Sequence, residues 1–205
     1  MGGFFGAVSR KNCKYDVFFG TDYHSHLGTR RGGLAFYDVE KGFQREIHNI
    51  ENTPFRTKFE SSMPKLDGTV GLGAIADTDP QPLLVRSHLG MFAIANVGII
   101  NNAEEIVAKT FAAPGHYFMA MSSGKVNSAE LVAALINRCD NLVDGIRYAQ
   151  ELIEGSCTIL LLTTDGIIAA RDKLGRLPVV IGKGQDGCCV SLESFACQKL
   201  GYQPC

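Results

Sequence analysis

Apolar residues recur along this chain in short runs separated by turn residues, a pattern typical of β-strands. The first run extends from Gly3 to Ser9 and is followed by the charged pair Arg10-Lys11. Turns at residues 40–42 and 87–90 each separate two further runs. Strands are predicted over residues 3–9, 33–39, 43–50, 69–75, 82–85, 91–100, 157–163, 166–170, 178–181 and 188–192.

Apolar residues at helical spacing form a second pattern. Residues Tyr15 to Leu27 show it, and Gly28 follows as a predicted helix stop. Asn101-Asn102 followed by Glu104-Glu105 predicts a helix start, because carboxylates are favourable near the positive end of the helix dipole. Further helices are predicted over residues 128–139, 142–153 and 193–200.

The predicted elements follow one another in the order strands, helices, strands. Because strands and helices do not alternate, this order argues against a parallel doubly wound sheet and for a layered α+β domain. The 205 residues are 45% hydrophobic, enough to bury a core as one domain, and neither a repeat nor a low-complexity linker divides them. We therefore expect a single domain over residues 1–205.

The charge pattern narrows the range of partners. The formal net charge is -1 and the charged residues are interspersed, so no basic stripe indicates nucleic acid or an anionic membrane surface. No apolar run approaches the roughly 20 residues that span a bilayer. The apolar stretch at the N-terminus also lacks the basic region that precedes the core of a signal peptide. We expect neither a nucleic-acid partner nor a membrane partner.

The spacing of the cysteines and histidines does not predict a metal site. The seven cysteines are scattered without a CxxC motif, which favours reduced thiols in a cytoplasmic protein. His24 and His26 lie two residues apart in a predicted helix, where they do not face one another. Two glycine patterns, at 71–76 and 182–187, fit a dinucleotide-binding motif. Prolines follow the first pattern, and the second is typical of a hairpin turn. We expect no metal and no cofactor.

Several segments, taken in order, carry a family resemblance. They are Gly3-Phe4-Phe5-Gly6, His26-Leu27-Gly28 with Gly33-Leu34, Gly71-Leu72-Gly73, Gln81-Pro82, Ala95-Asn96-Val97-Gly98 with Asn102-Ala103, Glu130-Leu131, Arg171-Asp172 with Gly175 and Pro178, and Glu193-Ser194. Together they resemble the N-terminal glutaminase domain of amidophosphoribosyltransferases, which are class II glutamine amidotransferases and N-terminal-nucleophile hydrolases. The resemblance covers almost the whole chain and implies a four-layer αββα sandwich.

The departures from the family pattern concentrate on its chemistry. In the family, an N-terminal Cys attacks glutamine and its own α-amino group acts as the base. The resemblance places this nucleophile at Gly2, the arginine that holds the glutamine carboxylate at Ala76, the oxyanion asparagine at Val97, the aspartate that holds the amino group at Ser128 and a further arginine at Leu27. Gly98, a backbone donor to the oxyanion, is retained. Asn96 is one position away from the oxyanion position.

These departures lead us to expect an inactive glutaminase domain, so whether the chain is an enzyme is left open. The resemblance implies that it is the N-terminal part of a longer, homo-oligomeric chain, with a C-terminal phosphoribosyltransferase domain and a structural or regulatory role. One alternative is a binding module whose pocket accepts another small ligand. A second is an engineered Cys-to-Gly form of an active glutaminase. A third, chemistry relocated to Cys13, lacks a base nearby in the sequence.

Overall fold

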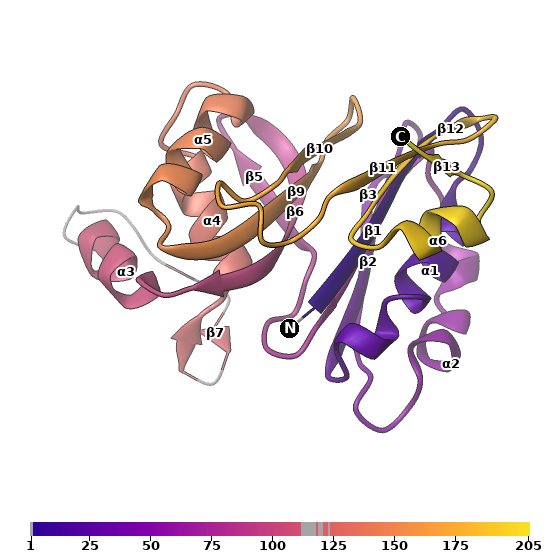
Figure 1. The fold of residues 1–205 in the computed structure, drawn as a ribbon, viewed down its shortest axis with the longest axis horizontal. Coiled ribbons are helices and arrows are strands. Elements are labelled where there is room, and N and C mark those ends of the chain that lie inside the picture. Colours follow the sequence, from indigo (N-terminus) through magenta and orange to yellow (C-terminus); the bar gives the residue numbers. More distant parts are fainter. Residues whose placement is uncertain (1, 112–117, 119–120, 123) are drawn as a thin grey trace.

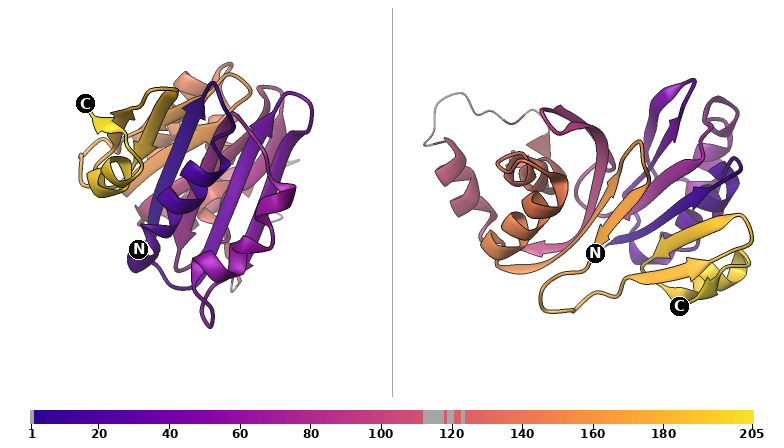
Figure 2. Two further views of the ribbon diagram at one scale, coloured as in Figure 1. Left: turned by 90° about the vertical axis from the view of Figure 1, so that its right-hand side faces the viewer. Right: turned by 90° about the horizontal axis from the view of Figure 1, so that it is seen from above.

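The computed structural model describes residues 2–111, 118, 121–122 and 124–205. Two antiparallel β-sheets lie face to face, and helices cover the outer face of each sheet (Figure 1). The described residues thus form the four αββα layers predicted from the resemblance. The C-terminal segment lies beside the N-terminal strand, in yellow and indigo in Figure 2, so residues from both ends of the chain share one sheet.

The larger sheet has seven strands and is centred on the N-terminal strand. Their spatial order is β13 (Gln203–Pro204), β11 (Val180–Lys183), β12 (Gly187–Ser191), β1 (Gly2–Ser9), β4 (Val70–Ala76), β2 (Arg31–Asp38) and β3 (Gly42–Asn49). The first residue of β1, Gly2, pairs with Ala76 at the end of β4. Ala76 pairs in turn with Arg31 at the start of β2. This register places the end of β4 beside Gly2 and the start of β2 on the far side of β4.

The smaller sheet has four strands. Their spatial order is β10 (Ile167–Ala170), β9 (Gly155–Leu162), β6 (Gly90–Ile100) and β5 (Leu83–Ser87). The long strand β6 pairs with β9 from Ala93 to Ile100, with Gly98 opposite Cys157. A separate two-stranded ribbon consists of β7 (Met121–Ser122) and β8 (Lys125–Val126).

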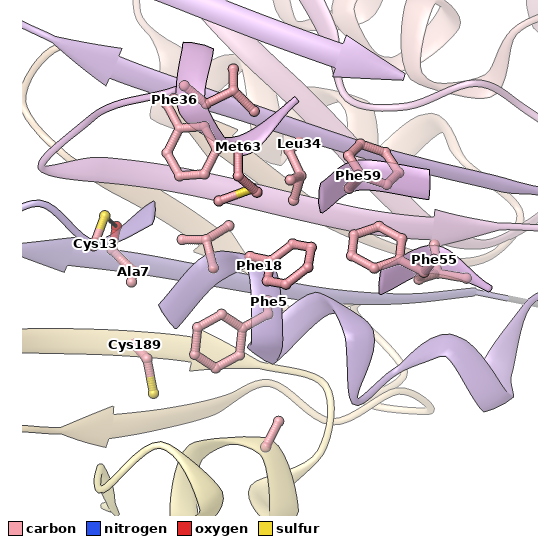
Figure 3. Close-up of a cluster of buried hydrophobic side chains, with 14 of the residues drawn as sticks. Phe5, Ala7, Cys13, Phe18, Leu34, Phe36, Phe55, Phe59, Met63 and Cys189 are labelled. Atoms are coloured by element: carbon pink, nitrogen blue, oxygen red, sulfur yellow. Dashed lines mark hydrogen bonds between the residues drawn. The ribbon is translucent and has the colours of Figure 1, made fainter. Parts of the chain in front are cut away.

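Aromatic side chains dominate the contact between the larger sheet and its helices. The helices on this side are α1 (Lys14–Asp22), α2 (Phe55–Glu60) and α6 (Ser194–Lys199). Phe18 from α1 and Phe55 and Phe59 from α2 pack with Phe5 and Phe36 of the sheet (Figure 3). Buried aromatic rings contribute large apolar areas, so this layer holds the N-terminal strand firmly from behind.

The other outer layer and the space between the sheets are mainly aliphatic. Helices α3 (Ala103–Phe111), α4 (Ser128–Ile136) and α5 (Leu142–Leu152) cover the smaller sheet. Between the sheets, Phe4 and Leu72 of the larger sheet meet Ala93 and Leu160 of the smaller one. Alternate residues of each strand therefore face the sheet-sheet core and the helices.

The predicted strands are all present, but one predicted helix was too long and one helix was not predicted. The helix predicted over 15–27 ends at Asp22 and is followed by a separate 3-10 turn over Ser25–Leu27. The side chain of His24 is within hydrogen-bond distance of the Gly20 carbonyl oxygen, at 2.7 Å, and replaces helical bonding there. Gly28 is extended and is not a left-handed helix stop. Helix α2 was not predicted, although its two phenylalanines have helical spacing.

Candidate functional site

A cavity of about 410 Å³ lies where the start of β1, the end of β4, strand β6 and the start of α4 meet. The family resemblance singled out six positions from distant parts of the sequence. The structure brings all six to the lining of this one cavity: Gly2, Leu27, Ala76, Val97, Gly98 and Ser128. The volume falls within the range of small-molecule sites.

Gly2 has no room for a side chain in the observed backbone. It is buried and pairs with Ala76 at the end of β4. A Cβ atom at this position would overlap the carbonyl oxygen of Ile75. A cysteine would therefore fit only after the start of β1 moved away from β4, a displacement that costs stability.

The pair Val97-Gly98 forms another wall of the cavity. Val97 is 6% exposed and contributes a branched alkyl group at the position where the resemblance places an amide. Gly98 has φ +144°, a conformation that side chains rarely adopt, and a Cβ there would overlap the carbonyl oxygen of Ser156. The backbone conformation at position 98 thus requires glycine. The neighbouring side chain, that of Val97, offers no hydrogen-bond donor.

Asn96 does not replace the amide that is missing at Val97. Side chains alternate along β6, and Val97 belongs to the core between the sheets. The Asn96 side chain lies on the helix side, with Nδ2 3.8 Å from Cys157 Sγ and Oδ1 3.2 Å from Ser128 Oγ. Its backbone N–H donates to Gln81 Oε1 at 2.7 Å. Asn96 therefore belongs to the polar group at the start of α4.

A buried carboxylate lies behind this polar group. Asp79 is 8% exposed, and its Oδ2 accepts hydrogen bonds from the Ser128 backbone N–H at 3.0 Å and from Ser128 Oγ at 2.7 Å. The neighbouring N-cap, Asn127, accepts the N–H of Ala129 at 2.8 Å. Asp79 was not predicted as part of the site, because its position in a loop does not indicate that its side chain contacts α4.

None of the described residues that line the cavity carries a charged side chain. Ala76 and Leu27, where the resemblance places arginines, contribute only apolar groups. An ion that enters such a space without partners loses several kcal/mol of hydration. The lining thus gives no direct partner to the carboxylate of an amino acid.

The two neighbouring histidines have separate environments. His24 is fully buried, with Nδ1 2.7 Å from the Gly20 carbonyl oxygen and Nε2 3.2 Å from Ser191 Oγ. Burial lowers the pKa of its imidazole. His26 is half-exposed and contacts Glu193 at 3.2 Å. No group of three or more His, Cys, Asp or Glu residues suited to a metal ion occurs within the described part of the chain.

The cysteines give no nucleophile at the cavity. Cys13 is buried in the aromatic layer behind the larger sheet, where its thiol donates to the Gly68 carbonyl oxygen at 3.3 Å. Burial raises the pKa of Cys13 to about 12, and it raises the pKa of Cys157 to about 12 as well. A thiol with such a pKa is inert at neutral pH. The hydroxyl of Ser128 contacts the Asp79 carboxylate and the Asn96 amide oxygen but no imidazole, so it also lacks an effective base.

Sequence comparisons find relatives over nearly the whole chain, although no protein-family model matches it. An amidophosphoribosyltransferase of Methanocaldococcus jannaschii is 27% identical over 212 residues, covering 98% of this chain and 44% of that protein. One of Archaeoglobus fulgidus is 31% identical over 182 residues, covering 86% of this chain and 39% of that protein. The chain therefore spans less than half the length of these relatives.

Two solved structures share the fold. The glutamine phosphoribosylpyrophosphate (PRPP) amidotransferase from B. subtilis, complexed with ADP and GMP, has a TM-score of 0.87 at 23% identity, covering 99% of this chain and 44% of that chain. A structure described as the allosteric regulatory enzyme of purine biosynthesis has a TM-score of 0.85 at 23% identity. At this level of identity the matches establish the fold and not the activity. No described helix is long and apolar enough to cross a membrane.

Proposed function

From the relation of this chain to the N-terminal part of amidophosphoribosyltransferases, we propose that it is a glutaminase-type domain that does not hydrolyse glutamine. Its role is then structural or regulatory, beside a phosphoribosyltransferase domain of the kind that acts in purine synthesis. The observation that carries this proposal is that Gly2, which the resemblance aligns with the nucleophile, lines the cavity and has no space for a side chain in the observed backbone.

The other substitutions support the same conclusion. Loss of the nucleophile removes the covalent route. Removal of one oxyanion donor, as at Val97, typically costs about 3 kcal/mol of transition-state stabilisation. Without the charged clamps at Ala76 and Ser128, glutamine is not oriented for attack. Each loss acts on a different step, so none compensates for another.

A binding module is the second candidate function. The cavity persists at about 410 Å³ and keeps an ordered polar group of Gln81, Asn96 and Ser128. A cavity that had lost every function would not need to keep these polar side chains ordered. An engineered Cys-to-Gly form is less favoured, because it explains Gly2 alone and leaves Ala76, Val97 and Ser128 unexplained.

The substitution Gly2→Cys separates a degenerate site from an engineered knockout. We expect no ammonia release from glutamine above the level of the parent chain, because the clamps and the oxyanion amide stay absent. The variant should also lose about 1–3 kcal/mol of unfolding free energy, since the new Cβ overlaps the carbonyl oxygen of Ile75.

Mass spectrometry first verifies that Met1 is removed, so that the new cysteine has a free amine. Val39→Ala, at an 83% exposed position, serves as the stability control. Robust glutaminase activity in Gly2→Cys would show that the pocket is intact, and the knockout interpretation would then replace ours.

We further propose a cytoplasmic homo-oligomer, following the resemblance and the free thiols of all seven cysteines. Light scattering on the purified chain measures the oligomeric state directly. A strict monomer at cellular concentration would contradict this part of the proposal.

A further inference from the structure

Two buried cysteines lie side by side in the layer behind the larger sheet. Cys189 belongs to β12 and Cys197 to α6, and both side chains pack in the aromatic core of that layer. Figure 3 shows the sulfur of Cys189 on the side of the sheet that α6 covers. Both are free thiols, and the thiol of Cys189 donates to Cys197 Sγ at 3.1 Å. Because a disulfide needs its sulfur atoms at about 2.05 Å, a displacement of roughly 1 Å would join them.

The contact between the two thiols makes their reactivity unequal. The hydrogen bond that Cys189 donates lowers the pKa of Cys197, and the same bond raises the pKa of Cys189. A thiolate, and not a thiol, attacks an oxidant. Cys197 is therefore the attacking sulfur, and Cys189 is the neighbouring thiol that resolves its oxidised product.

The other buried cysteines have different partners. The thiol of Cys13 donates to the carbonyl oxygens of Ala7 and Gly68. Cys157 Sγ lies 3.8 Å from the amide nitrogen of Asn96. Burial raises the pKa of both thiols to about 12, so we expect them to resist oxidation at neutral pH.

The segment between the paired cysteines reaches the cavity. Leu192 contributes to the cavity lining. Ser191 Oγ lies 3.2 Å from Nε2 of His24, whose side chain packs against Gly3. A bond from Cys189 to Cys197 would close a short loop that contains both Ser191 and Leu192, and would restrain this wall of the cavity.

We propose that Cys189 and Cys197 form a redox-sensitive dithiol, which a peroxide oxidises to a disulfide and a thiol reductant restores. Both sulfurs are buried, so a small oxidant such as hydrogen peroxide suits the site better than a bulky disulfide. The site does not depend on the proposed function, because neither thiol lines the cavity.

The reaction has two balanced steps. The Cys197 thiolate attacks one peroxide oxygen, the O–O bond breaks, and the departing hydroxide takes up the proton that Cys197 released. This step leaves a sulfenic acid and one water. The sulfur of Cys189 then attacks the sulfenic sulfur, and its proton leaves with the hydroxide as a second water. The two thiols thus lose two electrons, and one hydrogen peroxide is reduced to two waters.

Peptide mapping of the peroxide-treated chain tests the proposal. Trypsin combined with a glutamate-specific protease cuts after Lys183, Glu193 and Lys199, which places Cys189 and Cys197 in separate peptides. After submillimolar peroxide and alkylation of the remaining thiols, we expect these peptides to be joined in most molecules. Dithiothreitol should separate them, and Cys13 and Cys157 should still be alkylated.

Variants identify the sulfurs involved. Cys188 is exposed and shares a peptide with Cys189, so Cys188→Ser is the matched control and should keep the bond. Cys189→Ser should abolish it and leave a sulfenic acid at Cys197 that dimedone traps. If Cys189→Ser fails to fold, Cys188→Ser decides, because Cys189 is then the single cysteine of its peptide.

The restraint on the cavity wall has its own measurement. Amide hydrogen exchange over residues 190–196 should be slower in the oxidised chain than in the reduced chain. Equal exchange in the two forms would contradict the restraint.

Three outcomes of the mapping would overturn the inference. The first is the absence of a joined peptide in Cys188→Ser. The second is a bond from Cys197 to Cys188 in the parent chain. The third is oxidation of Cys13 and Cys157 to the same extent, which would indicate general unfolding in place of a selective site. None of these readouts involves ammonia, so hydrolysis of glutamine would contradict the proposed function alone.

Discussion

His24 lies directly behind the start of the first strand, with its side chain against Gly3. Its ring is fully buried and its pKa is lowered from 6.5, chiefly by desolvation. The folded state therefore binds a proton at His24 less readily than the unfolded state does. By linkage, this group stabilises the fold fully above its unfolded pKa, and the stability decreases as the pH falls below that value.

We predict that the unfolding free energy of the chain decreases between pH 7 and pH 5 through His24. One proton accounts for at most about 1.4 kcal/mol per pH unit. Urea denaturation across this range measures the slope. His24→Gln, which cannot protonate, should flatten it even though the variant is less stable overall. His88→Gln, the same change at an exposed position, should keep the parent slope. An equal slope in the parent chain and in His24→Gln would rule out this role.

The sequence motifs singled out positions that the structure brings to one cavity, but the groups around them could not be predicted. Gly2, Ala76, Val97 and Ser128 meet at one cavity because the motifs fix their place in the fold. Asp79 was missed because it belongs to a loop, whose path depends on contacts with α4 that local pattern does not encode. The same holds for the crowding of Gly2 against Ile75, which depends on strand register.

At the level of elements, the start of α4 joins two parts of the chain that shape the cavity. Asn127 caps the helix through Oδ1, and its Nδ2 donates to the Pro80 carbonyl oxygen at 3.0 Å. Asn127 is fully buried. One side chain thus fixes both the helix that carries Ser128 and the loop that carries Asp79.

We predict that Asn127→Ala lowers the free energy of unfolding by more than the loss of an ordinary helix cap does. Loss of an N-cap typically costs about 0.5–2 kcal/mol, and loss of the hydrogen bond to the partly buried Pro80 carbonyl adds about 1 kcal/mol. Asn141→Ala is a matched control, because Asn141 caps α5 through the Asp144 N–H at 2.9 Å but is exposed. Chemical denaturation compares the two variants. Equal losses would show that the bond to Pro80 contributes nothing.

Alternation and turn residues located the longer strands, but the two-residue strands β7, β8 and β13 were not predicted, because they are too short to show alternation. Helix α2 was missed because six residues are too few for a reliable helical period. The predicted helix over 15–27 was too long because hydrophobic spacing does not register the side-chain bond from His24 to Gly20. Such errors arise where a tertiary contact overrides local preference.

At the level of the whole molecule, local pattern gave an α+β class, and the four layers came from the family resemblance. The order of seven strands around β1 depends on pairings between residues as distant as Phe5 and Ser191. No local signal specifies these pairings. The same architecture brings the six positions singled out by the resemblance to one cavity.

Ammonia release from glutamine by the purified chain tests the central claim most directly. Without a nucleophile at Gly2, or charged clamps at Ala76 and Ser128, we predict a rate equal to that of a blank at millimolar glutamine. An active amidophosphoribosyltransferase assayed in parallel establishes the sensitivity of the measurement. Turnover of about 1 s⁻¹ or faster, persisting through repurification and proportional to the amount of this chain, would contradict the account.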